Sequence, residues 1–196
     1  MQQPEEGVIK FICEHIVADP LPGAQLSELK HFRQLLYMQK LIGADENGIG
    51  YGNISRRFNH TSQFIISGTQ TGHLEELSNY EFTLVNSYDI GNNWLQCTGP
   101  VIASSESLSH AALYSVSKEI NAVIHVHHNA AWQKLLNKIP KTPEHIPYGS
   151  PQMADAISAL HNSEDNVIIM GGHFGGIISY GENLEHAFNS LIKVLC

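Results

Sequence analysis

The residues with the clearest chemical potential are His125 and His127, which flank Val126 at the end of an apolar run that begins at Ala122. Such a run is typical of a buried strand. Because the side chains of a strand point alternately to its two faces, both imidazoles are expected on the same face. Neutral imidazole nitrogens are common ligands of Zn²⁺ and of similar transition metals. The pair therefore predicts a metal-chelating edge on a rigid strand.

A third histidine, His173, follows a second apolar run, residues 167–170, and lies between two pairs of glycines. Glycines allow the backbone to approach a metal or a substrate closely. Three protein ligands leave one coordination position open, which is typical of a catalytic metal rather than a structural one. The alternative is that two strand histidines and one turn histidine bind nothing.

Ser104, Ser105 and Glu106 immediately precede a helix that the sequence predicts over residues 107–118. Serine caps helices and glutamate complements the positive end of the helix dipole, which explains the tripeptide in structural terms. The same helix end, with its two hydroxyls, would also bind an anion. Glu106 is a candidate proton-transfer group beside the metal. His110 is a candidate neighbour of the metal ligands, although a place at the edge of the core or on the surface is the simpler expectation.

Two further segments are candidates for contact with a ligand. Gly52 and Asn53 precede a predicted strand, where glycine allows close approach and asparagine offers an amide, but a simple turn explains them as well. Residues 67–72 carry hydroxyls and small side chains that would bond to phosphate or carboxylate oxygens. They lack the spacing and the lysine of a nucleotide-binding P-loop.

Hydrophobic periodicity predicts the elements that must position these residues. Helices are expected over residues 7–18, 26–42, 107–118, 130–138, 151–161 and 183–195, and strands over residues 54–58, 63–66, 82–87, around 94, 122–127 and 167–170. The last helix is opened by Asn183, a favourable N-cap residue. The chain contains no internal repeat and no shift in composition. We therefore expect a single domain over residues 1–196, in which helices cover a sheet.

Composition excludes several classes of function. The chain has 196 residues and a net charge of −8, so a general affinity for nucleic acid or acidic membranes is not expected. The three cysteines are far apart and indicate neither a disulfide framework nor a cysteine zinc site. Residues 1–6 are polar and acidic, unlike a secretory signal, and no apolar run approaches a membrane span. A cytoplasmic location is the default expectation.

Taken in order, these motifs resemble the class II aldolase/adducin family. The resemblance extends from about Leu26 to Leu195 and is carried by residues 52–55, Ser67-Gly68, Ser104-Ser105-Glu106, the His125/His127 pair and the glycine-flanked His173. The family includes fuculose-phosphate-type aldolases, ribulose-phosphate epimerases and methylthioribulose-phosphate dehydratases. The resemblance implies an α/β fold of three layers, with a central, mainly antiparallel sheet between helical layers. It also implies a homo-oligomer, commonly a tetramer with sites at subunit contacts.

The resemblance also implies roles for individual residues. It makes His125, His127 and His173 the ligands of one divalent metal ion per chain, with Zn²⁺ expected first and Mn²⁺, Fe²⁺ or Co²⁺ as alternatives. Glu106 would be the acid/base residue. A substrate phosphate would be held by Asn53, Ser67, Gly68, Ser104 and Ser105.

The function that follows is a metal-dependent lyase, an aldolase that cleaves a small sugar phosphate or hydroxy-carbonyl compound through a metal-stabilised enediolate. A related sugar-phosphate dehydratase is an alternative within the family. A second alternative is a non-catalytic, adducin-like binding or assembly domain. The absence of proline before Ser67 and the short stretch after the last helix favour it. A cupin-like oxygenase also uses a His-X-His pair, but its nearly all-β fold disagrees with the helical patterns.

Overall fold

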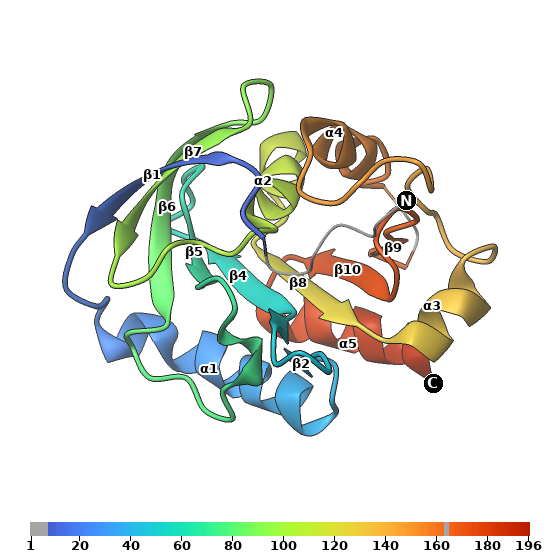
Figure 1. Ribbon diagram of the computed structural model, residues 1–196, viewed down its shortest axis with the longest axis horizontal. Coiled ribbons are helices and arrows are strands. Elements are labelled where there is room, and N and C mark those ends of the chain that lie inside the picture. Colours follow the sequence, from blue (N-terminus) through green and yellow to red (C-terminus); the bar gives the residue numbers. More distant parts are fainter. Residues whose placement is uncertain (1–7, 163–164) are drawn as a thin grey trace.

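The computed structural model describes residues 8–162 and 165–196 and has a mixed α/β fold with a large central sheet (Figure 1). The strands are β1 (Ile12–Val17), β2 (Gly43–Ala44), β3 (Gly50–Tyr51), β4 (Asn53–Arg57), β5 (Phe64–Ser67), β6 (Phe82–Asp89), β7 (Trp94–Gly99), β8 (Ala122–His127), β9 (Val167–Ile169) and β10 (Gly176–Gly181). The helices are α1 (Gly23–Met38), α2 (Ser107–Val116), α3 (Asn129–Leu135), α4 (Pro151–Ala159) and α5 (Leu184–Leu195), with a short 3₁₀ turn at Thr71–His73.

Eight strands form the main sheet in the order β1-β7-β6-β5-β4-β8-β10-β9, and β2 pairs with β3 separately. The edge strand β1 runs parallel to β7, whereas the other neighbouring strands of the main sheet are antiparallel. Strand β8 therefore lies inside the sheet, between β4 and β10. This position makes it a rigid platform for the two histidines.

Two hydrophobic clusters lie on the two faces of this sheet. On one face, strand residues such as Val123 pack with α2 and α4, and on the other, residues such as Ile124 pack with α1 and α5. Figure 1 shows the same arrangement, with α2 and α4 on one side of the strands and α1 and α5 on the other. Because Val123 and Ile124 are neighbours in β8, their assignment to opposite clusters confirms the alternation predicted for this strand.

The first predicted helix is wrong. Gly7 lies outside the described residues, as do the polar residues 1–6, but Ile12–Val17 forms strand β1. The spacing of the apolar residues fits either structure, and two features favour the strand. The segment is rich in β-branched side chains, and it pairs along its whole length with β7, from Ile12 opposite Trp94 to Val17 opposite Gly99. Pairing with β7 therefore determines that this segment is a strand and not a helix.

The remaining predicted elements are confirmed with shifted ends. The helix predicted over residues 26–42 is α1, which ends at Met38 because the chain turns at Lys40 with a positive φ of 58°. Asn183 caps α5 as expected, since its Oδ1 accepts a hydrogen bond from the backbone N–H of His186 at 2.7 Å. Strand β10 was not predicted, because it begins and ends with glycine and directly follows a glycine-rich turn.

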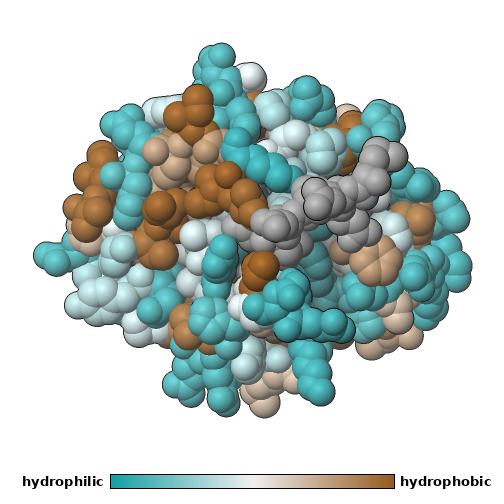
Figure 2. Space-filling view, viewed as in Figure 1, coloured by the Kyte–Doolittle hydropathy of each residue, from teal (hydrophilic) through white to brown (hydrophobic). Residues whose placement is uncertain are grey.

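Hydrophobic residues gather on the surface over the β1 side of the molecule (Figure 2). Strand β1 and the residues just before it expose four large apolar side chains, Val8, Ile12, Ile16 and Val17. No helix within the described parts of the chain is long and apolar enough to cross a membrane.

Candidate metal centre

Strand β8 places two of the three predicted metal ligands. His125 lies opposite Asn53 of β4 and Ile178 of β10, and His127 lies opposite Gly176. His125 is almost fully buried and His127 is half-buried. The two rings are 5.0 Å apart between centroids, so the alternation of the strand has brought them together on one face.

The third histidine comes from the turn that joins β9 to β10. The backbone N–H of His173 donates to Met170 O at 3.1 Å, and its own carbonyl accepts from Gly176 N at 2.8 Å. This tight turn brings the His173 ring within 5.1 Å of His125 and 4.6 Å of His127, centroid to centroid. One ligand atom from each of the three side chains lies within 4.8 Å of the others.

Glycines let this turn fit against the segment that precedes α4. A Cβ atom on Gly171 would lie 2.2 Å from Thr142 O, and one on Gly172 would lie 1.7 Å from Ile146 O. Real Cβ atoms do not approach a backbone oxygen so closely. The two glycines are therefore required for the position of His173.

The donor set fits a transition-metal ion. Burial, followed by the neighbouring His127, His173 and His110, lowers the pKa of His125 well below its usual range, so its ring is neutral and keeps a lone pair for a ligand. His125 Nε2 is also buried without a hydrogen-bond partner. A buried, unsatisfied nitrogen is costly, and coordination of Zn²⁺ or a similar ion would satisfy it.

Glu106 lies beside this cluster, as the N-cap residue that immediately precedes helix α2. Its side chain is nearly fully buried. Ser109 Oγ donates a hydrogen bond of 2.8 Å to Glu106 Oε2, and Glu106 Oε1 lies 4.0 Å from His173 Nδ1. The serine therefore fixes one carboxylate oxygen, while the other is near the histidines.

The five residues expected to hold a phosphate are all buried, but they are placed differently. Asn53 Nδ2 lies 3.3 Å from His125 Nδ1, which makes Asn53 a direct neighbour of the metal cluster. Ser104 Oγ accepts from the backbone N–H of Glu106 at 3.3 Å, and Ser105 lies between these two residues. The structure thus brings Asn53, Ser104 and Ser105 beside the residues expected to do chemistry.

Ser67 and Gly68 are tied into the sheet. Ser67 Oγ accepts from the backbone N–H of Ile54 at 3.2 Å, and Gly68 N donates to Glu81 O at 2.8 Å. Gly68 also forms an isolated bridge with Ala103, next to Ser104. Only the Ser67 hydroxyl hydrogen remains for a ligand here, since the backbone N–H of Gly68 is already used.

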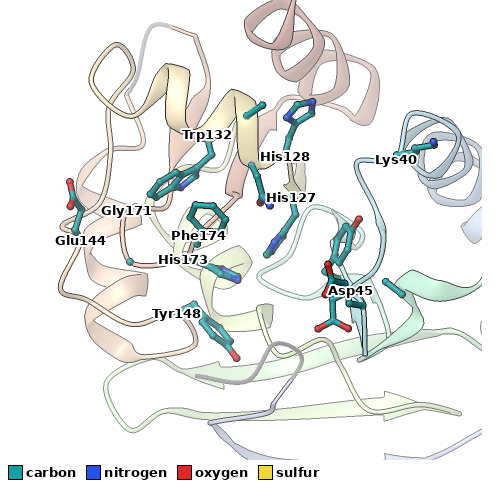
Figure 3. Close-up of a pocket in the computed structure, with 16 residues that line it drawn as sticks. Lys40, Asp45, His127, His128, Trp132, Glu144, Tyr148, Gly171, His173 and Phe174 are labelled. Carbon is teal, nitrogen blue, oxygen red and sulfur yellow. The ribbon is translucent and has the colours of Figure 1, made fainter. Parts of the chain in front are cut away.

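A cavity of about 910 Å³ opens on the cluster. Figure 3 shows His127 and His173 close together at the cavity, with Tyr148, Phe174 and Trp132 nearby and Asp45 across from His127. Trp132 packs edge-on against Phe174 and donates from Nε1 to Met170 O at 2.9 Å. The open side of the metal cluster therefore faces a space large enough for a small organic molecule.

Sequence reasoning missed two tyrosines near the cluster and chose the wrong one of two expectations for His110. Tyr51 and Tyr148 contact His127 and His173 through their rings, and no sequence pattern linked them to these histidines. His110 was expected at the core edge or on the surface, but it is completely buried, and its Nδ1 lies 2.7 Å from Ser55 Oγ. Its position one helical turn after Glu106 was the signal that could have placed it inside.

The sequence matches one known protein family over most of its length. The family described as Class II Aldolase and Adducin N-terminal domain matches residues 35–194. No curated protein gives a significant match to the sequence.

Several solved structures share the fold. An L-fuculose 1-phosphate aldolase is 21% identical with a TM-score of 0.69, covering 90% of this chain and 84% of its own. A sugar-phosphate aldolase from Thermotoga maritima is 14% identical with a TM-score of 0.66, covering 88% and 90%. YgbL from Escherichia coli, whose description leaves the reaction open among aldolase, epimerase and decarboxylase, is 18% identical with a TM-score of 0.65, covering 87% and 84%.

The TM-scores establish a shared fold with these proteins, and the family match spans most of the chain. Proteins of this fold differ in the reaction that their descriptions state, so the fold alone does not select one. The chain belongs to the class II aldolase and adducin N-terminal domain family.

Proposed function

We propose that this protein is a metal-dependent lyase of the aldolase type, which cleaves a small hydroxy-carbonyl compound such as a sugar phosphate. The observation that carries the proposal is the position of Glu106 Oε1, 4.0 Å from His173 Nδ1, beside three histidines whose ligand atoms lie within 4.8 Å of one another. A scaffold domain has no need to bury a carboxylate beside three imidazoles.

We assign separate roles in metal binding, proton transfer and substrate binding to the residues of the site. His125, His127 and His173 would hold one divalent ion, Zn²⁺ in the first instance, which would act as a Lewis acid toward a substrate carbonyl. Glu106 would move a proton between substrate carbon and oxygen, and the hydrogen bond from Ser109 keeps its other oxygen in place. The cavity around Tyr51 and Trp132 would receive the rest of the substrate.

A phosphate group would bind at the start of helix α2. Ser104 and Ser105 supply two hydroxyls near a helix N-terminus, and Asn53 supplies an amide beside His125. Ser67 and Gly68 complete the set that we propose for phosphate, with the Ser67 hydroxyl as their donor. We further propose a cytoplasmic homo-oligomer, a tetramer by analogy with the family.

The test is metal analysis of untagged protein, since a histidine tag would bind metal itself. We expect about one transition-metal ion per chain in the wild type, its loss in His127→Ala and its retention in Glu106→Gln. Glu106→Gln should reduce turnover in a retro-aldol screen of sugar phosphates by roughly 10²–10⁴-fold, because it removes the proton-transfer group but not the ion.

Two outcomes would contradict the proposal. A wild type that takes up no metal, even after incubation with Zn²⁺ or Mn²⁺, would leave a binding or assembly domain as the function. Metal-loaded protein that eliminates water from the substrates without cleaving a carbon–carbon bond would indicate the dehydratase.

A further inference from the structure

The ring of His173 is stacked on a second ring that belongs to a distant segment. Tyr148, just before helix α4, lies with its ring centroid 4.3 Å from that of His173, and the two planes differ by only 21°. Tyr148 is 2% exposed and His173 is 4% exposed, so both rings are almost fully buried in the wall of the cavity. A flat partner at this distance restricts rotation of the imidazole about its Cβ–Cγ bond.

Lys10 completes a three-membered column with these rings. Its Nζ lies 3.3 Å from the centroid of the Tyr148 ring and donates a hydrogen bond of 2.8 Å to Tyr148 O. An ammonium group and an imidazole at these distances do not fit over the same face of one phenol ring. Lys10 and His173 therefore lie on opposite faces of Tyr148, in a cation–π contact and a ring stack respectively.

Lys10 is itself held in this place from two directions. Asn93, in the turn between β6 and β7, donates from Nδ2 to Lys10 O at 2.8 Å. Gly149 has a positive φ of 67°, and a Cβ atom there would lie 3.2 Å from Lys10 Cδ, so the glycine leaves room for the lysine stem. The segment before β1 is thus fastened to the segment before α4, 138 residues away.

We propose that Tyr148 and Lys10 are positioning residues for His173: Tyr148 sets the plane of the imidazole, Lys10 fixes Tyr148, and together they determine how tightly the histidine cluster binds its metal ion. This inference rests on the proposed role of the cluster as a metal site. Lys10 lies outside residues 35–194, so the column adds a feature that the family match does not cover.

The physical basis is the ordering of a ligand before the ion arrives. In the column, His173 is already restricted to the orientation in which it faces His125 and His127. Without Tyr148 the imidazole would gain freedom that metal binding must then remove, and the affinity would fall. Groups that orient metal-binding histidines typically change metal affinity by about tenfold to a hundredfold.

The experiment measures zinc affinity of the full chain by competition with a chromophoric chelator. We expect Tyr148→Leu to weaken zinc binding by roughly 10–100-fold. Tyr148→Phe should keep the wild-type affinity because its ring still stacks, and Lys10→Met should weaken binding by less than Tyr148→Leu does. The absorption spectrum of the Co²⁺-loaded protein should change in Tyr148→Leu and stay unchanged in Tyr148→Phe.

Tyr180→Leu is the matched control. Tyr180 is also a buried tyrosine of the α2/α4-side cluster, but it lies opposite Val123, at the end of β10 away from His127. It should lower the stability of the metal-free protein to urea while leaving zinc affinity unchanged. If Tyr148→Leu behaves like Tyr180→Leu, losing stability at unchanged zinc affinity, Tyr148 has only a packing role and the inference is wrong.

The outcomes separate this inference from the proposed function. Zinc binding that is lost in His173→Ala but unaffected by Tyr148→Leu and Lys10→Met would overturn the inference and leave the metal site standing. A wild type that binds no zinc would overturn both. If Tyr148→Leu fails to fold, Lys10→Met still tests the inference, because a zinc affinity of Lys10→Met equal to that of the wild type would overturn it.

Discussion

At the scale of single residues, His110 shows how strongly burial controls protonation in this protein. Its ring is completely buried on α2, with Nδ1 2.7 Å from Ser55 Oγ, which in turn lies 2.7 Å from the Tyr114 hydroxyl. Burial lowers the pKa of His110 from 6.5 to about 3. The ring is therefore neutral at any pH at which the protein is expected to work.

This shift predicts a dependence of stability on pH. The unfolded chain binds a proton at His110 near pH 6.5, and the folded protein does so only near pH 3. The contribution of the neutral His110 to the free energy of unfolding is therefore fully present above pH 6.5 and is lost as the pH falls from 6.5 towards 3. In this range His110 changes the free energy of unfolding by up to about 1.4 kcal/mol per pH unit. We expect the free energy of unfolding, measured with urea in the presence of EDTA, to change less with pH between 7.5 and 4.5 for His110→Gln than for the wild type.

Tyr114→Phe serves as the control for this measurement. It removes a hydroxyl from the same buried network but leaves the imidazole, so it should lower stability while keeping the wild-type slope. Equal slopes for His110→Gln and the wild type would show that His110 does not titrate in this way.

At the scale of elements, the site depends on one strand and one turn. Strand β8 needs only its alternation to bring His125 and His127 together. The turn between β9 and β10 needs two glycines, because the backbone before α4 occupies the space where side chains would lie. Loss of that fit would displace His173.

The turn provides a prediction with a matched control. Gly172→Ala places a Cβ atom 1.7 Å from Ile146 O, so we expect destabilisation of roughly 1–3 kcal/mol and weaker metal binding through His173. Gly91→Ala meets its nearest atom, Asp89 Oδ1, at 3.5 Å and should change stability by less than about 0.5 kcal/mol. Urea unfolding and zinc titration of both variants test this, and equal behaviour of the two would refute the role assigned to the turn.

At the scale of the whole molecule, the net charge and the exposed apolar side chains predict association with protein rather than with nucleic acid. The net charge of −8 opposes binding to polyanions, while Ile12, Ile16 and Val17 expose apolar side chains on the edge strand β1. The single-domain organisation stays a prediction, although the main sheet draws its strands from Ile12 to Gly181.

We predict that light scattering after size-exclusion chromatography gives four times the chain mass of 21.7 kDa. The physical reason is that exposed apolar side chains are removed from water when copies associate. A single species at the mass of one chain, at all concentrations tested, would show that the protein is a monomer and that the analogy with tetrameric family members does not hold.

The sequence by itself determined what depends on local periodicity and on motifs. The period of two places His125 and His127 on one face, Asn183 marks the start of α5, and the order of the motifs indicated the family. These properties depend on neighbours within a few positions, so one sequence is enough to show them.

Only the tertiary structure decided which distant segments meet. Residues 12–17 form a strand because β7 is available to pair with them, although their apolar spacing also fits a helix. Tyr148 reaches His173, and Lys10 reaches Tyr148, only after the chain has packed, and the hydrogen bond between Lys10 and Tyr148 joins residues 138 positions apart. Such contacts leave no periodic signal, because they arise from the packing of whole elements and not from the direction of side chains within one element.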